Sequence, residues 1–249
     1  MQDNPAAVIK LTLAYDGTDY HGWQKQPGLK TIQGKVEEAL FRLTGQSVLL
    51  YGAGRTDAGV HALAQVAHFK SDRLFPEKNW VRGLNAFLSQ DIAIASAKVA
   101  EPSFHARFSA KEKQYRYVIH TASIRTPLDR HRSWHVRYSL NLEEMRRAAR
   151  HFIGDHDFTS FGAVDGESKT KMINLKEIQI TKEAMEIVIT VAGSRFLKYM
   201  VRNIVGFLVD IGMGRRYQNE IPDILSARDR RMAGPTAPPQ GLYLVKVTY

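Results

Sequence analysis

The chain has 249 residues, of which 44% are hydrophobic and 24% charged, as expected for a globular protein of one large or two small domains. It has no cysteine, which excludes disulfides, a thiol nucleophile and zinc sites with cysteine ligands. The net charge of +10 favours a polyanionic partner, nucleic acid before membrane, although solubility alone would also account for it.

The sequence carries no signal for a membrane or for export. No apolar run reaches the roughly 18 residues that a transmembrane helix needs. Residues 1–7 are polar and lack the pattern of a signal peptide. We therefore expect a cytoplasmic protein without membrane association.

Strand and helix patterns alternate through the first hundred residues. Strand patterns occupy 8–15, 48–51, 63–69 and 92–99. Helical patterns occupy 32–43, with Thr31 as N-cap, and 76–88, with Trp80, Leu84 and Phe87 expected on the buried face. The order β-α-β-β-α-β predicts a ferredoxin-like half, with both helices on one face of an antiparallel sheet.

Two aromatic residues, Tyr20 and Trp23, follow the first strand pattern and stand close to Lys25. Their rings could fill the edge of a core. They could equally stack on nucleotides while the lysine contacts phosphate, an arrangement typical of single-stranded nucleic-acid binding. The residue pattern leaves both interpretations open.

The segment Gly54-Arg55-Thr56-Asp57-Ala58-Gly59-Val60-His61-Ala62 carries a guanidinium, a hydroxyl, a carboxylate and an imidazole between two strand patterns. Asp-x-Gly is also common turn chemistry, in which the aspartate bonds its own backbone. In the functional interpretation a nearby cation keeps Asp57 ionised as a nucleophile or base, and Arg55 can reach either Asp57 or a phosphate. Neither a P-loop nor a G-x-G-x-x-G motif accompanies the segment.

The second half repeats the strand and helix rhythm weakly. Strand patterns occupy 111–119, 173–181, 186–192 and a last run ending at 247, with 157–161 interpreted as strand or turn. Helical patterns occupy 140–152, with Asn141 as N-cap, 198–212 and 221–227. We expect two domains, residues 1–103 and 104–249.

A metal site is not expected. His151, His156 and Asp157 look like a ligand cluster, but their spacing does not fit an i, i+4 helical pair and Gly154 interrupts the helix between them.

The nine residues from Gly54 to Ala62 resemble the active-site signature of the TruA family of tRNA pseudouridine synthases. Further stretches at 15–24, 104–119, 196–206 and 234–244 resemble the same family, so the resemblance runs from about Val8 to Tyr249. It implies an α+β protein of two ferredoxin-like halves, whose antiparallel sheets join around a central catalytic cleft. It also implies a homodimer in which one tRNA contacts both subunits, and no cofactor.

The resemblance also implies a reaction and the residues that perform it. The reaction is conversion of uridine to pseudouridine in the anticodon stem-loop, at tRNA positions 38, 39 and 40. Asp57 falls on the catalytic aspartate, the expected nucleophile, and Arg202 on the arginine that pairs with it. Tyr115 falls on the active-site tyrosine that packs against the target base, although Tyr117 fits by chemistry alone. Arg55 is expected to contact the substrate.

Two other classes of protein stay open. A non-catalytic RNA-binding protein with ferredoxin-like halves would explain the charge and the aromatics, but not the Arg-Thr-Asp loop. A glycosidase or nucleosidase usually needs a second acid, and Asp57 has no obvious acidic companion. Whether Asp57 would first attack C1′, attack C6 or remove a sugar proton cannot be read from the residues.

Overall fold

The computed structural model describes residues 6–166 and 170–249, and the chain forms two compact units. Unit 1 consists of Met1–Lys111 and Leu244–Tyr249, and unit 2 of Glu112–Tyr243. The first five residues of the polar N-terminal segment lie outside the described residues. The division into compact units reflects contacts within the chain and not independent folding. The domain boundary expected between residues 103 and 104 therefore stays a prediction.

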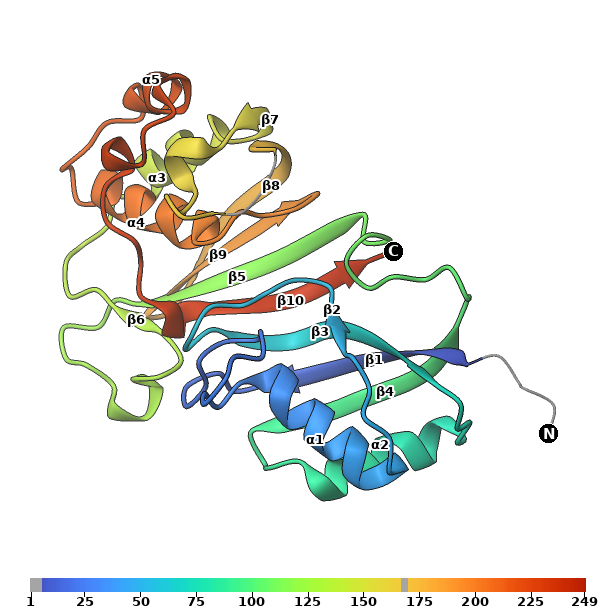
Figure 1. Ribbon diagram of the computed structural model, residues 1–249. Helices are drawn as coiled ribbons and strands as arrows, with labels where there is room; N and C mark the ends of the chain where they lie inside the picture. Colours follow the sequence, from blue (N-terminus) through green and yellow to red (C-terminus); the bar gives the residue numbers. More distant parts are fainter. Residues whose placement is uncertain (1–5, 167–169) are drawn as a thin grey trace. The chain divides into compact units, whose positions relative to one another are not determined.

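Unit 1 is built on an antiparallel sheet in the order β4-β1-β3, and the short β2 also pairs with β3. Its elements are β1 (Ala7–Tyr15), α1 (Ile32–Thr44), β2 (Tyr51–Gly52), β3 (His61–Ser71), α2 (Glu77–Phe87) and β4 (Ile92–Ala100), and the C-terminal β10 (Leu242–Thr248) also pairs with β3. Helices α1 and α2 lie together on one side of the sheet (Figure 1). This is the predicted ferredoxin-like arrangement.

The alternation of β1 decides which face of the sheet the helices cover. Ile9, Leu11 and Leu13 are at most 1% exposed. Ile9 pairs with Phe69 of β3, whose ring centroid lies 5.5 Å from that of Trp80 in α2. The odd-numbered positions of β1 therefore face the helices, and the even-numbered ones face the other side.

The predicted helices of unit 1 are confirmed, with one error in their buried faces. The Thr31 side chain accepts a hydrogen bond from a backbone N–H of the first turn of α1 at 3.3 Å, so it is the N-cap. Trp80 and Leu84 are buried, as predicted, but Phe87 is 36% exposed. Phe87 ends α2, and the Arg42 guanidinium covers its ring at 4.5 Å from the centroid.

The strand predicted over Val48–Tyr51 is wrong for its first three residues, since only Tyr51 and Gly52 pair with β3. The reason is visible at Leu50. Its N–H donates to Glu37 Oε1 at 3.2 Å, and its carbonyl accepts from Gln33 Nε2 at 3.0 Å. Side chains of α1 satisfy this backbone, so it needs no strand partner.

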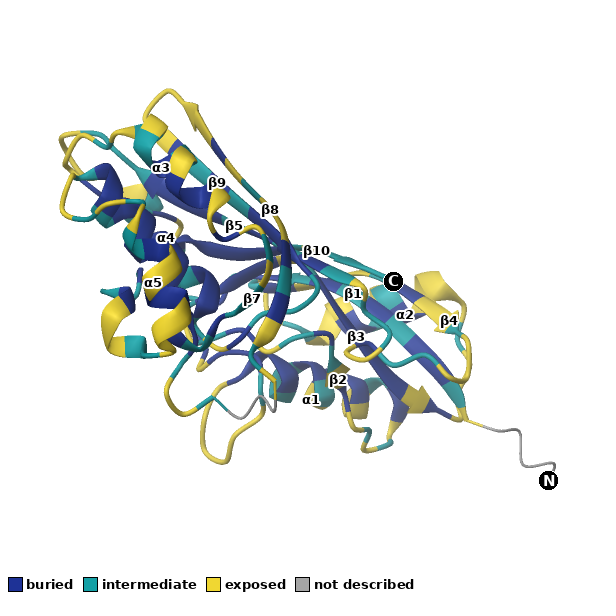
Figure 2. Cartoon of the chain, turned by 90° about the horizontal axis from the view of Figure 1, so that it is seen from above, coloured by how far each residue is buried: buried dark blue, intermediate teal, exposed yellow. Residues whose placement is uncertain are grey.

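Unit 2 holds an antiparallel run of strands in the order β5-β9-β8-β7. Its elements are β5 (Glu112–His120), β6 (Trp134–His135), α3 (Leu142–Arg150), β7 (Gly154–Asp157), β8 (Met172–Glu183), β9 (Glu186–Gly193), α4 (Met200–Gly212) and α5 (Glu220–Ala227). The predicted strands and helices of this half are confirmed to within two residues at each end, except at 157–161, where the structure has the last residue of β7 and a 3-10 turn over Thr159–Phe161. Residues 154–156 of β7 and all of β6 were not predicted. Helix α4 is buried over most of its length (Figure 2). No helix in the described part of the chain is long and apolar enough to cross a bilayer.

Candidate active site

The loop that carries Asp57 connects β2 to β3. The N–H of Val60 donates to the carbonyl of Asp57 at 3.2 Å, so the turn suggested by the Asp-x-Gly pattern forms. Gly59 completes it with φ +76°, a left-handed conformation that glycine adopts without strain. Asp57 is half-buried and Arg55 is exposed. The loop therefore carries one carboxylate and one guanidinium at positions two residues apart.

A second loop, residues 16–23, binds the backbone of this turn. The N–H of Trp23 donates to the carbonyl of Thr56 at 3.0 Å, and the N–H of Gly59 donates to the carbonyl of Tyr20 at 3.3 Å. These two bonds lie on either side of Asp57 in sequence. The backbone on both sides of Asp57 is thus held by contacts that do not use its carboxylate oxygens.

Buried side chains hold the loop in place through hydrogen bonds. The hydroxyls of Tyr15 and Thr56 lie 2.9 Å apart, and Gln65 Nε2 donates to the carbonyl of Gly54 at 2.8 Å. Gln65 is fully buried and also bonds Tyr15. Burial raises the pKa of Tyr15 to about 12, so its hydroxyl stays protonated at neutral pH. Neither Tyr15 nor Gln65 was predicted from the sequence; a glutamine within an apolar strand pattern was the available signal.

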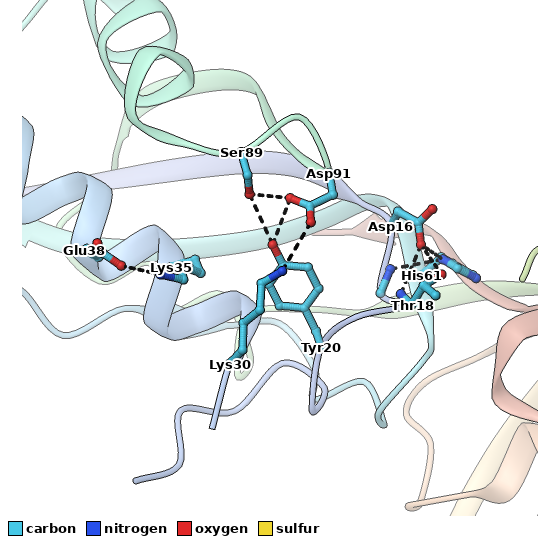
Figure 3. Close-up of polar contacts among 10 residues, drawn as sticks. Asp16, Thr18, Tyr20, Lys30, Lys35, Glu38, His61, Ser89 and Asp91 are labelled. Atoms are coloured by element: carbon cyan, nitrogen blue, oxygen red, sulfur yellow. Dashed lines mark hydrogen bonds and ion pairs between the residues drawn. The ribbon is translucent and has the colours of Figure 1, made fainter. Parts of the chain in front are cut away.

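His61 closes the loop at its C-terminal end (Figure 3). Its Nδ1 accepts a hydrogen bond from the N–H of Gly17 at 3.1 Å and also lies 3.2 Å from Asp16 Oδ1. A nitrogen that accepts from an amide carries no proton, so the approach of Asp16 is a close contact and not an ion pair in this tautomer. Asp16 Oδ1 instead accepts from the N–H of Thr18 at 3.0 Å and from its hydroxyl at 2.5 Å.

The outer end of loop 16–23 is anchored by Tyr20 and Asp91 (Figure 3). The Tyr20 hydroxyl donates to Asp91 Oδ1 at 2.8 Å, and Lys30 Nζ lies 4.2 Å from the Tyr20 ring centroid and 3.6 Å from Asp91 Oδ2. Tyr20 and Trp23 are both 2% exposed. They fill the core, and the interpretation of these two rings as nucleotide-stacking groups is wrong.

Gly22 packs closely against the backbone of the Asp57 loop and supplies a first prediction. A Cβ there would lie 2.5 Å from the carbonyl oxygen of Thr56, and its φ is +82°. We expect Gly22→Ala to lower the free energy of unfolding by about 1–3 kcal/mol through strain alone, and further through the clash, and to reduce turnover by displacing Asp57. Urea denaturation and single-turnover kinetics measure the two effects.

Gly28 supplies the matched control, since its φ is +73° but a Cβ added to it would meet nothing within 4 Å. Gly28→Ala should show the strain without the loss of turnover. Equal turnover in the two variants would mean that Gly22 does not position the Asp57 loop.

In unit 2, Tyr115 and Tyr117 lie two residues apart on β5. Tyr117 is fully buried and donates its hydroxyl to the carbonyl of Pro238 at 2.7 Å, and burial raises its pKa. Tyr115 is 7% exposed and meets the Phe196 ring edge-on at a centroid distance of 5.0 Å. Because the Tyr117 side chain is buried in the core and its hydroxyl is hydrogen-bonded there, Tyr115 is the better candidate for contact with a base.

Arg202 lies in the first turn of α4 and is half-buried. Its Nε donates to the carbonyl of Ala237 at 2.8 Å, and the N–H of Ala237 donates back to the carbonyl of Arg202 at 3.1 Å. Its guanidinium carbon is 5.0 Å from the centroid of the Tyr199 ring. The bond from Nε directs the guanidinium toward the loop of residues 234–238, and the backbone bond joins that loop to the first turn of α4.

That loop is held to α4 by Asn203, which is fully buried. Asn203 Nδ2 donates to the carbonyl of Phe161 at 2.7 Å, and its Oδ1 accepts from Thr236 Oγ1 at 2.6 Å and Arg230 Nη2 at 2.9 Å. These contacts were not predicted from the sequence either. Asn203 on an otherwise apolar helix face was the signal that could have found them.

Two of the residues considered as metal ligands, His156 and Asp157, make structural contacts instead. His156 Nε2 lies 3.1 Å from the carbonyl of Ile153, and Asp157 accepts from the N–H of Thr159 at 2.9 Å and pairs with Arg228 at 3.0 Å. Within residues 6–166 and 170–249, no group of three or more histidines and carboxylates could hold a metal ion.

The structure places Asp57 and Arg55 on one loop of unit 1, and Tyr115 and Arg202 on β5 and α4 of unit 2. The profile of a family described as tRNA pseudouridine synthase matches residues 12–109 and 148–249. These ranges include Asp57 and Arg202. Tyr115 lies in the stretch between them.

Relatives match the chain at high identity along nearly its whole length. A tRNA pseudouridine synthase A of Geotalea uraniireducens (strain Rf4) is 48% identical over 241 residues, which cover 97% of this chain and 99% of the relative. Proteins of the same name from Thermoanaerobacter sp. (strain X514) and Acetivibrio thermocellus are 46% and 44% identical, with the same coverage. A crystal structure of an archaeal box H/ACA sRNP complex aligns at a TM-score of 0.37 and 9% identity, over 93% of this chain and 58% of that one.

The matches to the profile and to the relatives span most of both units, so the chain is an RNA-modifying isomerase. It belongs to the tRNA pseudouridine synthase family.

Proposed function

We propose that this chain converts uridine to pseudouridine in the anticodon stem-loop of tRNA, at positions 38, 39 and 40, with Asp57 as nucleophile. Family membership supports the reaction. The observation that carries the role of Asp57 is its half-buried carboxylate on a turn bound from both sides by loop 16–23. The net charge of +10 suits a tRNA substrate.

The chemistry needs a uridine that has left its stack, since the reacting atoms are not accessible within one. The carboxylate of Asp57 attacks and bonds to the substrate, the N1–C1′ bond breaks, the uracil turns, and C5 bonds to C1′. The bond between Asp57 and the substrate then breaks, which regenerates the free carboxylate. C5 loses its hydrogen and N1 gains one, so the product is an isomer of the substrate. Because no electron or external group is transferred, the proposal needs no cofactor.

Three further residues take part in this proposal. Tyr115 stacks on the target base, Arg202 pairs with Asp57 and keeps it ionised, and Arg55 contacts the substrate. The anchoring of the Arg202 side chain through Nε supports its role, since a planar fork can hold a carboxylate in one orientation. The exposure of Arg55 suits contact with a phosphate.

The role of Tyr115 is tested by two substitutions. Tyr115→Phe keeps the ring and its contact with Phe196, whereas Tyr115→Ala removes both. Stacking of a base on an aromatic ring is worth about 1–3 kcal/mol, so we expect kcat/KM to fall by roughly 5- to 150-fold in the Ala variant and much less in the Phe variant. Steady-state kinetics on a tRNA transcript compares them, and equal impairment would mean that the ring is not the important part.

A homodimer in which one tRNA contacts both subunits, and a location in the cytoplasm, belong to the same proposal. Both rest on the resemblance seen in the sequence. Light scattering of the purified chain, alone and with tRNA, tests the dimer and its stoichiometry.

One experiment separates this function from the two other classes. Bulk tRNA is incubated with the chain and digested to nucleosides. Pseudouridine supports the proposal, an unchanged profile indicates RNA binding alone, and free uracil indicates a nucleosidase. Mapping the product on anticodon stem-loops tests the three positions.

A further inference from the structure

The face of the unit 1 sheet opposite α1 and α2 carries a row of basic and aromatic residues. Lys10 of β1 pairs with Lys98 of β4 on one side and with His68 of β3 on the other, and His68 pairs with Tyr51 of β2. Residues paired across antiparallel strands point to the same face. Lys70 joins the row, because it lies two residues after His68 on the same strand.

The segment of residues 101–111 lies against this row and adds to it. The N–H of Ala106 donates to His68 Nδ1 at 3.1 Å, and the hydroxyl of Tyr249 donates to the carbonyl of Ala106 at 2.8 Å. Ala106 is fully buried, which fixes the segment in place. The next two residues, Arg107 and Phe108, are exposed, and Phe108 is 77% exposed.

Four rings in this region form a continuous series. Ring centroids are 5.2 Å apart for Tyr51 and His68, 4.6 Å for His68 and His105, and 4.4 Å for His105 and Phe108. The end members are open to solvent, since Tyr51 is 47% exposed. The series therefore holds two exposed aromatic rings in place through less exposed neighbours.

Positive charge accumulates on the same face. Lys10 Nζ lies 4.2 Å from the Tyr249 ring centroid, and its pKa is lowered by burial and by the charge of Lys98. Among the described residues, no carboxylate forms an ion pair with Lys10, Lys70, Lys98 or Arg107. This face therefore carries several cations whose charge an anionic partner would neutralise.

We propose that this face binds RNA outside the reaction centre. The surface, here termed the basic aromatic surface, consists of Lys10, Tyr51, His68, Lys70, Lys98, His105, Arg107 and Phe108. Its cations contact phosphates, and Tyr51 and Phe108 stack on unpaired bases. Tyr51 begins the strand that leads into the Asp57 loop, so the surface adjoins that loop along the chain. The identification of this RNA as tRNA rests on the proposed function.

A second copy of the chain is a less suitable occupant. A two-fold interface brings the same patch of both copies together, and here it would gather the cations of both copies in one interface. RNA supplies the opposite charge along its whole backbone. It also supplies flat rings for the exposed aromatic residues.

The test uses two double variants of the full chain with equal loss of charge. Lys70→Ala/Lys98→Ala removes two exposed cations from the surface, and Lys78→Ala/Arg82→Ala removes two from α2, on the helix-covered side of the same sheet. Binding of an unmodified tRNA transcript is measured across a salt series. We expect weaker binding and a salt slope smaller by about 2 for the first variant only. Single-turnover rates at saturating tRNA should stay at the wild-type value.

Phe108→Ala tests the stacking separately and should weaken binding on the order of tenfold. Unchanged binding and an unchanged salt slope in the surface variants would overturn the proposal. So would a change from dimer to monomer in the absence of RNA, since the face would then join two copies. If the wild-type chain makes no pseudouridine while the surface variant still loses its salt slope, the proposed function fails and the RNA surface stands.

Discussion

Asp57→Asn is expected to abolish turnover, by on the order of 10³-fold or more, while tRNA binding survives. An amide is nearly isosteric with a carboxylate but is a poor nucleophile. The contacts that shape the turn use the backbone of residues 56–60, so the turn should persist in the variant. Binding is distributed over many cations and should be unchanged. Single-turnover kinetics and filter binding measure the two quantities.

Asp19→Asn is the matched control, because Asp19 is an exposed carboxylate in the adjoining loop of residues 16–23. It should react at close to the wild-type rate. Deamidation would restore aspartate, so the mass of the peptide that contains position 57 is checked before each measurement. Substantial activity in an undeamidated Asp57→Asn protein would remove Asp57 as the nucleophile.

The elements of this fold were predictable because their patterns are local. The N-caps Thr31 and Asn141 and the alternation of β1 are each contained within a few residues, and each is present in the structure. The errors arise where a residue distant in sequence determines the local hydrogen bonds or the exposure of a side chain. Leu50 bonds to side chains of α1 instead of a strand, and Phe87 is partly exposed under Arg42.

The candidate site divides in the same way. The loop that carries Asp57 could be recognised because its residues are contiguous. The residues that support the loop could not be recognised, because Tyr15 bonds Thr56 across 41 residues and Tyr20 bonds Asp91 across 71. No periodic pattern relates such positions. The two rings in loop 16–23 were ambiguous for the same reason, because only their burial shows that they fill a core.

Arg202→Met is expected to fold but to react slowly, on the order of 100-fold below the wild type at neutral pH. In the proposed pair, Arg202 holds Asp57 ionised and oriented. Breaking a desolvated pair costs up to about 3–5 kcal/mol, and the half-buried position of Arg202 places the effect toward the lower end. Arg202→Lys should be intermediate, because a point charge replaces a planar fork and the bond from Nε to Ala237 is lost.

The loss of Arg202 should also change how the reaction rate depends on pH. A neighbouring cation lowers the pKa of a carboxyl, so removing Arg202 would raise the pKa of Asp57. Since the ionised form reacts, the rate of Arg202→Met should be lost first at low pH, and its profile should move toward higher pH. Arg215→Met, just beyond the end of α4, is the control for losing an arginine and should leave the profile unchanged.

The competing role for Arg202 is contact with a tRNA phosphate. That role predicts weaker binding, a salt slope smaller by about one, and a normal single-turnover rate at saturating tRNA. The two roles therefore differ in the saturated rate, which binding defects cannot alter. Single-turnover rates of Arg202→Met at saturating tRNA, measured across pH, separate them. A normal saturated rate would end the pairing hypothesis. A slow rate that recovers as the pH rises would indicate that Arg202 acts by keeping the carboxylate of Asp57 ionised.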